Sequence, residues 1–117
     1  MALHTELDIY KAAYDMLGLT IDELIKNMPR SVSRAVGDRL RDECITLTVL
    51  IQTANMERDK APHFVAMLKS LGVVELLLRI SRDKRYIGLK GYAAAVLLTT
   101  SIGKQANALR RKFAPAA

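Results

Sequence analysis

The sequence has few of the features that stabilise secreted or membrane proteins. Its single cysteine, Cys44, has no partner for an internal disulfide, which excludes a disulfide-rich scaffold and favours a reducing compartment. The longest apolar stretch, residues 92–103, covers about twelve positions, short of the ~18 expected of a membrane-spanning helix. Polar residues at His4, Glu6 and Asp8 interrupt the region where a secretory signal would be apolar. We therefore expect a soluble, cytoplasmic protein.

Residues suited to catalysis and metal binding are also scarce. The two histidines, His4 and His63, fall near opposite ends of different predicted helices, and with Cys44 they do not have the spacing of metal ligands. Asp42 and Glu43 are adjacent, so on a helix they point about 100° apart rather than forming a catalytic pair. No glycine-rich phosphate-binding loop is present. We expect a protein that is not an enzyme and that uses no metal or other cofactor.

The composition that remains is both apolar and basic. A chain of 117 residues is long enough for one domain with its own core, which we expect to span residues 1–117. Half of the residues are hydrophobic, and 18 basic residues against 12 acidic ones leave a net charge of +6. This hydrophobic content excludes intrinsic disorder, and the charge favours anionic partners.

Apolar residues recur at helical spacing in four segments, and no segment shows the sustained alternation of a strand. Pro29 ends the first helix, because the residue before a proline is disfavoured in the α region. Pro62 suits the first turn of the third helix, and residues 83–88 form the loop before the fourth. Short loops make consecutive helices antiparallel, so the predicted fold is an all-α, up-down-up-down antiparallel four-helix bundle.

The first helix has the clearest apolar pattern. Thr5 is expected to cap it, and Ser31 or Ser33 to cap the second helix. The predicted core stripe of the first helix advances in steps of three and four residues: Leu3, Leu7, Tyr10, Tyr14, Leu17, Ile21, Leu24 and Met28. The stripe of the second helix includes Cys44, which we interpret as a core residue.

The third and fourth helices are more apolar than one bundle core requires. Apart from Glu75, residues 73–78 are apolar, and so are residues 93–98. Because a core-facing stripe covers only about a third of a helix surface, we expect the excess to face other copies of the chain in a homo-oligomer. Glu75 is expected to pair with Arg39 or Arg79 between helices.

Basic residues are concentrated in the last third of the chain. Residues 1–27 contain two basic and five acidic residues, whereas residues 82–117 contain eight basic residues and one acidic residue. In an antiparallel bundle the last loop lies at the same end as the first loop, and the last helical turn lies at the opposite end. The candidate nucleic-acid-binding residues in these segments are Arg30, Arg34, Arg82, Lys84, Arg85, Lys90, Arg110, Arg111 and Lys112.

Two interpretations of these cations stay open. A basic patch can neutralise phosphates and release counterions, which gives salt-dependent binding of nucleic acid. Alternatively, the cations are a solvated surface, and residues 110–112 stabilise a helix C-terminus through the macrodipole. The excess of basic over acidic residues favours the first interpretation for residues 82–90.

Short motifs along nearly the whole chain resemble the Avd-like four-helix-bundle proteins. The family's second-helix signature resembles residues 28–40, which begin Met-Pro-Arg-Ser, and residues 51–55, Ile-Gln-Thr-Ala-Asn. The end of its third helix resembles residues 74–87, and its fourth helix resembles Lys-Gly-Tyr at 90–92 and Ile-Gly-Lys at 102–104. The chain departs from the family at Leu109, often aromatic there, and at Ser101, commonly acidic.

The resemblance implies a cyclic homopentamer of bundles. The family includes accessory variability determinants of diversity-generating retroelements, which bind RNA or DNA and a partner reverse transcriptase. It also includes proteins encoded in intervening sequences of bacterial large-subunit ribosomal RNA. The function expected first is a non-enzymatic nucleic-acid-binding accessory protein of a reverse transcriptase. The alternative is a self-assembling structural protein of the intervening-sequence type with no nucleic-acid role.

Overall fold

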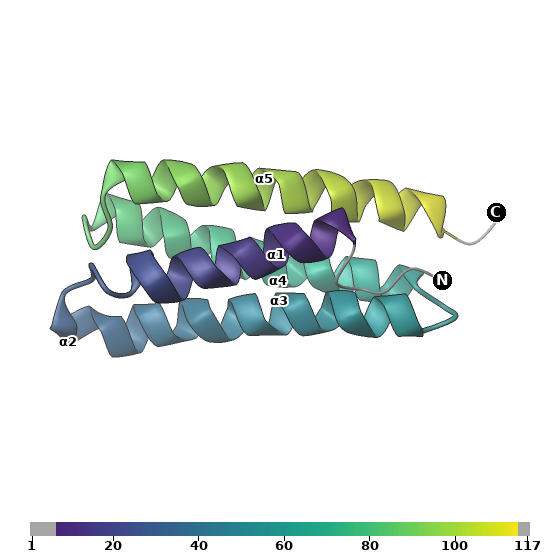
Figure 1. Ribbon diagram of the computed structural model, residues 1–117, viewed down its shortest axis with the longest axis horizontal. Coiled ribbons are helices and arrows are strands. Elements are labelled where there is room, and N and C mark those ends of the chain that lie inside the picture. The colour runs from purple at the N-terminus through teal and green to yellow at the C-terminus, as the bar shows by residue number, and fades with distance from the viewer. Residues whose placement is uncertain (1–6, 115–117) are drawn as a thin grey trace.

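Helices make up most of the computed structural model, which describes residues 7–114 of the chain (Figure 1). In order, the elements are α1 (Asp8–Leu19), the π-helical turn η2 (Thr20–Leu24), α2 (Arg30–Val32), the π-helical turn η3 (Ser33–Gly37), α3 (Asp38–Met56), α4 (Ala61–Asp83) and α5 (Leu89–Lys112). Residues 7–114 contain no strand, so the predicted all-α fold is confirmed. In the same range, no helix combines the length and the apolar character needed to cross a bilayer.

The long helices α1, α3, α4 and α5 form a four-helix bundle in which consecutive helices run in opposite directions (Figure 1). Neighbours pack in the order α1, α3, α4, α5 and back to α1. The side of the bundle between α1 and α3 is therefore opposite the side between α4 and α5. We call the end that contains α2 and residues 84–88 the α2 end, and the end that contains residues 57–60 and the last turn of α5 the α5 end.

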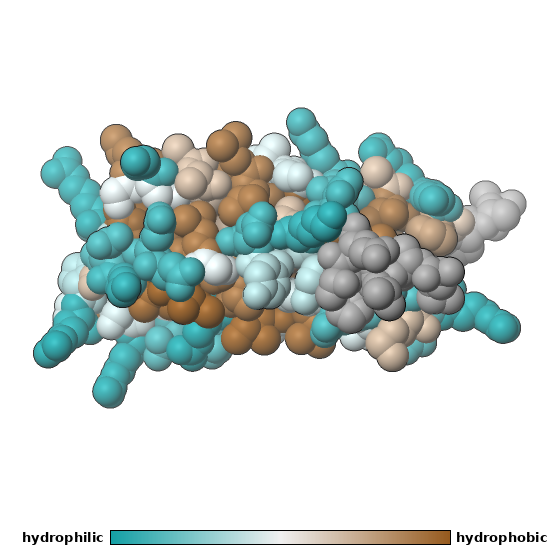
Figure 2. Space-filling model, in the orientation of Figure 1, coloured by the Kyte–Doolittle hydropathy of each residue, from teal (hydrophilic) through white to brown (hydrophobic). Residues whose placement is uncertain are grey.

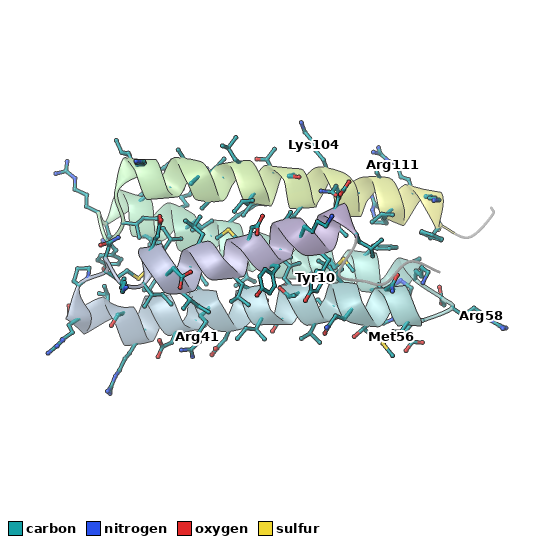
Figure 3. All side chains as sticks on the ribbon, in the orientation of Figure 1. Tyr10, Arg41, Met56, Arg58, Lys104 and Arg111 are labelled. Atoms are coloured by element: carbon teal, nitrogen blue, oxygen red, sulfur yellow. The ribbon has the colours of Figure 1, made fainter. Side chains whose placement is uncertain are left out.

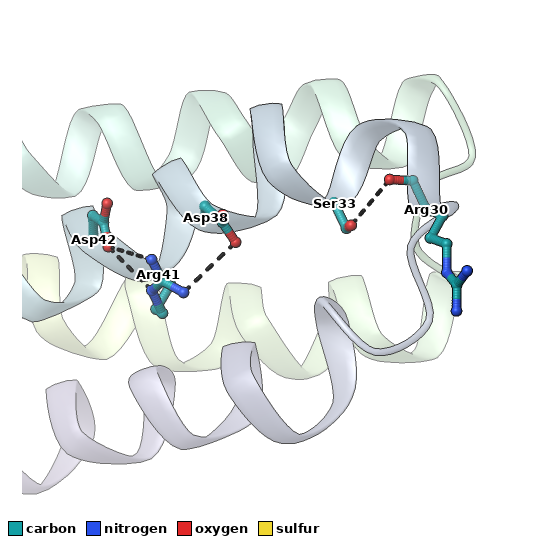
Figure 4. A network of polar contacts seen from close by, with 5 residues as sticks. All are labelled: Arg30, Ser33, Asp38, Arg41 and Asp42. Atoms are coloured by element: carbon teal, nitrogen blue, oxygen red, sulfur yellow. Dashed lines mark hydrogen bonds and ion pairs between the residues drawn. The ribbon is translucent and has the colours of Figure 1, made fainter.

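The helix boundaries follow the prolines more closely than the predicted caps. Pro29 precedes α2 with extended backbone (φ −55°, ψ 142°), and the second proline lies in the first turn of α4, as predicted. Neither Ser31 nor Ser33 caps α2, which begins at Arg30 with no side-chain cap. Ser33 Oγ instead donates to the carbonyl oxygen of Arg30 at 3.2 Å, a local bond that competes with capping (Figure 4). The other predicted cap, Thr5, lies outside the described residues.

The buried residues of α3 and α4 recur at helical spacing, and Cys44 is among them, as predicted. The buried residues of α3 include Leu40, Cys44, Leu47, Ile51 and Ala54, and those of α4 include Phe64, Met67, Leu71, Val74 and Leu78. These helices supply the largest share of the core, and they pack against each other.

The predicted core stripe of the first helix is wrong in part. Tyr14 is 60 % exposed and Ile21 is 47 % exposed, and the buried stripe is instead Ile9, Ala13, Met16, Thr20 and Leu24. Periodicity alone favours large apolar side chains over alanine and threonine. The small side chains let α1 approach its neighbours. The Thr20 hydroxyl donates a hydrogen bond to the Met16 carbonyl oxygen at 2.8 Å. As a result the tyrosines of α1 lie beside the core, and Figure 3 shows Tyr10 between α1 and α3.

Two glycines permit close packing at the α2 end. A Cβ on Gly91 would lie 3.0 Å from Leu24 Cδ2, and one on Gly37 would lie 3.1 Å from Ile25 Cγ1. The start of α5 and the turn η3 therefore both pack tightly on the segment that follows α1. This packing fixes the elements that carry the basic residues of the α2 end.

Candidate nucleic-acid interface

Five exposed basic side chains at the α2 end have no ion-pair or hydrogen-bond partner among residues 7–114. They come from three segments that the fold brings to one end: α2 with η3, the loop before α5, and the first turn of α5 (Figure 1). We call this set the α2-end cluster, and it consists of Arg30, Arg34, Lys84, Arg85 and Lys90. All five are exposed, and none forms an ion pair or side-chain hydrogen bond with another residue of the described chain. In Figure 4 the side chain of Arg30 extends from the start of α2 past the loop that precedes it.

The loop that carries Lys84 and Arg85 has a defined backbone. The Tyr86 N–H donates to the Ser81 carbonyl at 2.7 Å, and the Arg85 N–H donates to the Arg82 carbonyl at 3.0 Å. This pair of bonds is the Schellman motif that ends many helices. Arg85 occupies its left-handed position with φ 58°, where glycine is the usual residue. The backbone of the loop is therefore strained at Arg85, whose side chain has no partner in the described chain.

Arg82 differs from the other basic residues of the α2 end because its guanidinium group is engaged. Its Nε and Nη2 donate to Asp83 Oδ1 at 3.0 and 2.8 Å, and its Nη1 donates to Tyr92 Oη at 3.2 Å. The guanidinium carbon lies 4.7 Å from the centroid of the Tyr92 ring. The hydrogen bond to the Asp83 carboxylate raises the pKa of Arg82. These contacts join the end of α4 to the start of α5, so Arg82 positions the loop.

The α5 end places Arg110, Arg111 and Lys112 together in the last turn of α5. Arg110 Nη2 donates to Asn107 Oδ1 at 3.4 Å, and Lys112 Nζ lies 5.4 Å from the centroid of the Phe113 ring. Arg111 extends away from α5 (Figure 3). All three cations lie at a helix C-terminus, where the macrodipole stabilises positive charge.

Two further basic residues belong to the α5 end. Lys60 caps α3: its Nζ donates to the carbonyl oxygens of Ala54, Asn55 and Glu57 at 2.7, 3.2 and 2.8 Å. Arg58 is exposed and points outward beyond the end of the bundle (Figure 3). Neither residue was predicted from the sequence, because residues 57–60 alternate acidic and basic residues and show no net charge.

Lys26, at the α2 end, is a third basic residue that was not predicted from the sequence. It is exposed and has no ion pair among the described residues. Its segment includes Asp22 and Glu23, so the charge of the first helix concealed it. Along the chain, the acidic groups nearest to the α2-end cluster are Asp83 and Asp38, followed by Glu23 and Asp22.

The predicted pairing of Glu75 was wrong. Glu75 is exposed on α4 and forms no ion pair within the described chain, and Arg79 is likewise unpaired. Arg39 lies 3.8 Å from Glu43 instead, one turn along α3. The prediction failed because the apolar residues on both sides of Glu75 do not share one environment. Some face the core, some face a neighbouring helix and some face solvent.

The single cysteine of the chain lies in the core. Cys44 is 1 % exposed, which confirms its place in the core, and its Sγ lies 3.7 Å from Thr20 Oγ1. Burial raises the pKa of the Cys44 thiol to about 11, so the reactive thiolate is rare at neutral pH. Within residues 7–114, no group of three or more His, Cys, Asp and Glu side chains could hold a metal ion.

Comparisons with protein-family models, with curated proteins and with solved structures gave no match for this chain. Any functional assignment therefore depends on the residues and geometry described above.

Proposed function

We propose that this protein binds nucleic acid through its α2-end cluster as a non-enzymatic accessory protein, similar to the Avd partner of a retroelement reverse transcriptase. The observation that carries the proposal is the set of five exposed cations that have no partner in the part of the chain that the structure describes. Such side chains break no ion pair when they meet phosphates, so the full electrostatic gain is available for binding. Arg82, held by Asp83 and Tyr92, gives the loop a fixed shape for this contact.

The proposal includes self-association in the cytoplasm, with a cyclic pentamer as the form that the family resemblance implies. Exposed apolar side chains support self-association, because soluble monomers rarely leave such residues clustered on a helix surface. Leu76 on α4 and Leu97 on α5 are 62 % and 75 % exposed, in the segments where the sequence predicted an excess. Apolar side chains also extend along the side between α1 and α3 (Figure 2).

The test is the salt dependence of binding. Fluorescence anisotropy with a labelled RNA hairpin and a labelled single strand should show affinity that falls steeply as salt rises, with a log–log slope of roughly −3 to −4 if four phosphates are neutralised. A shallow slope would contradict contact through the cluster.

A second candidate is a self-assembling structural protein with no nucleic-acid role, in which the cations only keep an apolar oligomer in solution. The exposed apolar side chains favour self-assembly in either case. The same titration separates the two candidates: absence of binding at micromolar protein and moderate salt would support the structural role.

A further inference from the structure

The guanidinium group of Arg82 is held in a fixed position over the ring of Tyr92 at the α2 end. Its carbon atom lies 4.7 Å from the ring centroid, and its Nη1 donates to Tyr92 Oη at 3.2 Å. Asp83 holds the same group from another direction, because its Oδ1 accepts from Nε and Nη2 at 3.0 and 2.8 Å. These contacts restrict an arginine side chain that would otherwise have many rotamers on a protein surface.

Arg82 is poorly suited to neutralise a phosphate. The Asp83 carboxylate already balances its charge, and three of the five N–H groups of the guanidinium are donating hydrogen bonds. Despite these contacts, 36 % of the surface of the side chain stays exposed. What Arg82 offers a ligand is therefore the flat face of its guanidinium group. Nucleobases stack on arginine planes as they do on aromatic rings.

An exposed apolar side chain lies beside Tyr92. Leu89 is 76 % exposed in the first turn of α5, and it precedes Tyr92 by three residues, so the two share a face of the helix. Lys90 follows Leu89 directly, and Lys84 and Arg85 lie in the loop before it. The α2 end thus places a flat and apolar surface among the cations of the α2-end cluster. We call Arg82, Leu89 and Tyr92 the stacking surface.

A duplex and a single strand would meet this surface differently. Bases in a duplex stack on one another, so outside its grooves a duplex presents phosphate and sugar to a protein. An unpaired nucleotide presents the face of its base as well. The cations attract both forms, whereas an exposed leucine and a fixed guanidinium plane gain contact only from an unpaired base.

We propose that the α2 end binds single-stranded nucleic acid, with an unpaired base stacked on the guanidinium plane of Arg82 and packed against Leu89. The neighbouring phosphates meet Lys84, Arg85 and Lys90 of the α2-end cluster. Arg82 then determines specificity for the form of the strand, and the unpaired cations determine the electrostatic part of the affinity. The inference rests on nucleic-acid binding in the proposed function and adds the form of nucleic acid that is bound.

Three labelled ligands test the stacking by fluorescence anisotropy. They are a single-stranded RNA of about twelve nucleotides, the same RNA in a duplex, and a strand of abasic sites with the same number of phosphates. The wild type should bind the single-stranded RNA roughly five- to tenfold more tightly than the abasic strand. Arg82→Lys keeps the charge but removes the plane, so its affinities for these two strands should differ by less than about twofold. Its affinity for the duplex and its salt slope should not change.

Leu89→Ala tests the second part of the stacking surface. It should weaken binding of the single-stranded RNA by about threefold and leave binding of the duplex and of the abasic strand unchanged. The matched control is Leu97→Ala, which removes the same side chain, 75 % exposed, about two turns further along α5. Leu97 lies away from the stacking surface, so this variant should leave the ratios among the three affinities as they are in the wild type.

The outcomes separate stacking from the proposed function. A wild type that binds the abasic strand as tightly as the single-stranded RNA would overturn the stacking and leave the proposed function standing. An Arg82→Lys variant that weakens all three ligands by the same factor would also overturn it, because Arg82 would then only position the loop. Failure of the wild type to bind any of the three ligands would overturn the proposed function itself. Circular dichroism of each variant shows whether the bundle is folded.

Discussion

The two ends of the bundle both carry several basic side chains, but the protein uses them differently. At the α5 end, Lys60 caps α3 through three carbonyl oxygens, and the cations of α5 sit at a helix C-terminus. At the α2 end, only Arg82 is engaged, and the five residues of the α2-end cluster have no partner in the described chain. Charge alone does not separate the ends. The partners separate them only in part, because Arg58 and Arg111 at the α5 end are exposed and form no ion pair in the described chain. Cations that stabilise the fold are poor candidates for binding, and unpaired cations are good ones.

The largest effect is expected from removing three cations at each end in turn. Lys84→Ala/Arg85→Ala/Lys90→Ala should weaken RNA binding by roughly 10- to 100-fold and reduce the salt slope by about 2 to 3, because phosphate contacts are lost. Arg110→Ala/Arg111→Ala/Lys112→Ala removes the same net charge and should weaken binding by less than about threefold. Anisotropy titrations at three salt concentrations measure both. Equal losses in the two variants would erase the distinction between the ends.

The next effect concerns stability at the α5 end. Lys60→Met keeps the aliphatic chain but removes three charge-assisted hydrogen bonds to carbonyl oxygens, and should lower the free energy of unfolding by about 1–2 kcal/mol. RNA affinity should stay the same. Urea unfolding followed by circular dichroism measures the first, and the anisotropy assay measures the second. A Lys60→Met variant with full stability and weak binding would reverse the roles assigned to the two ends.

At the α2 end, replacing Arg85 with glycine should have opposite effects on stability and on RNA binding. Arg85→Gly relieves the left-handed backbone and should raise the free energy of unfolding by about 1 kcal/mol, while it weakens RNA binding. Arg85→Ala removes the same charge but keeps the strain, so it should bind RNA as weakly as the glycine variant without the gain in stability. If the two variants unfold at the same urea concentration, the strain at this turn is not significant.

Tyr92→Phe should have a smaller effect. The substitution removes the hydroxyl that accepts from Arg82 and leaves every cation in place, so affinity should fall by only about twofold and the salt slope should not change. Slope and affinity together distinguish positioning of the loop from direct phosphate contact. A reduced slope in this variant would mean that Arg82 itself had lost a phosphate.

Cys44, between the two ends, should report no change in any of these variants. With the thiol pKa at about 11, alkylation by iodoacetamide at pH 8 should be slow and should rise about tenfold per pH unit until that value. Below pH 9 the thiol is neutral in both the folded and the unfolded chain, so its ionisation does not change the free energy of unfolding there. Above pH 9 the unfolded chain ionises first, so stability falls. Fast alkylation at pH 8 in a variant would show that its core has opened.

The sequence predicted the helices and their order because prolines and apolar periodicity are local signals. Pro29 and Pro62 mark two helix starts, and the stripes of α3 and α4 consist of large side chains whose spacing is unambiguous. The stripe of α1 was misplaced because its buried positions include the small residues Ala13 and Thr20, whereas the prediction followed larger side chains such as Tyr14. Helix packing favours small residues at close approach, and only the neighbouring helices show where that approach occurs.

The candidate site was predictable by location but not by role. Antiparallel topology is enough to bring residues 30–34 and 82–90 to one end of the bundle. It cannot show that Arg82 is held by Tyr92, or that Lys60 caps α3, because those contacts depend on side-chain directions at loops. The unpaired state of Glu75 was equally hidden, since burial of a single helical position depends on the rotation of the whole helix.

The apolar side chains exposed along α3, α4 and α5 have a consequence for valency, because they allow bundles to pack side by side. If copies pack side by side without inversion or axial shift, every bundle points the same way and every α2-end cluster lies on one face of the assembly. One cluster of five cations gives modest affinity, but a strand that contacts one cluster is held at high effective concentration near the next. Binding would then depend on assembly in a threshold manner, with dissociated copies releasing RNA at salt concentrations that the intact assembly tolerates.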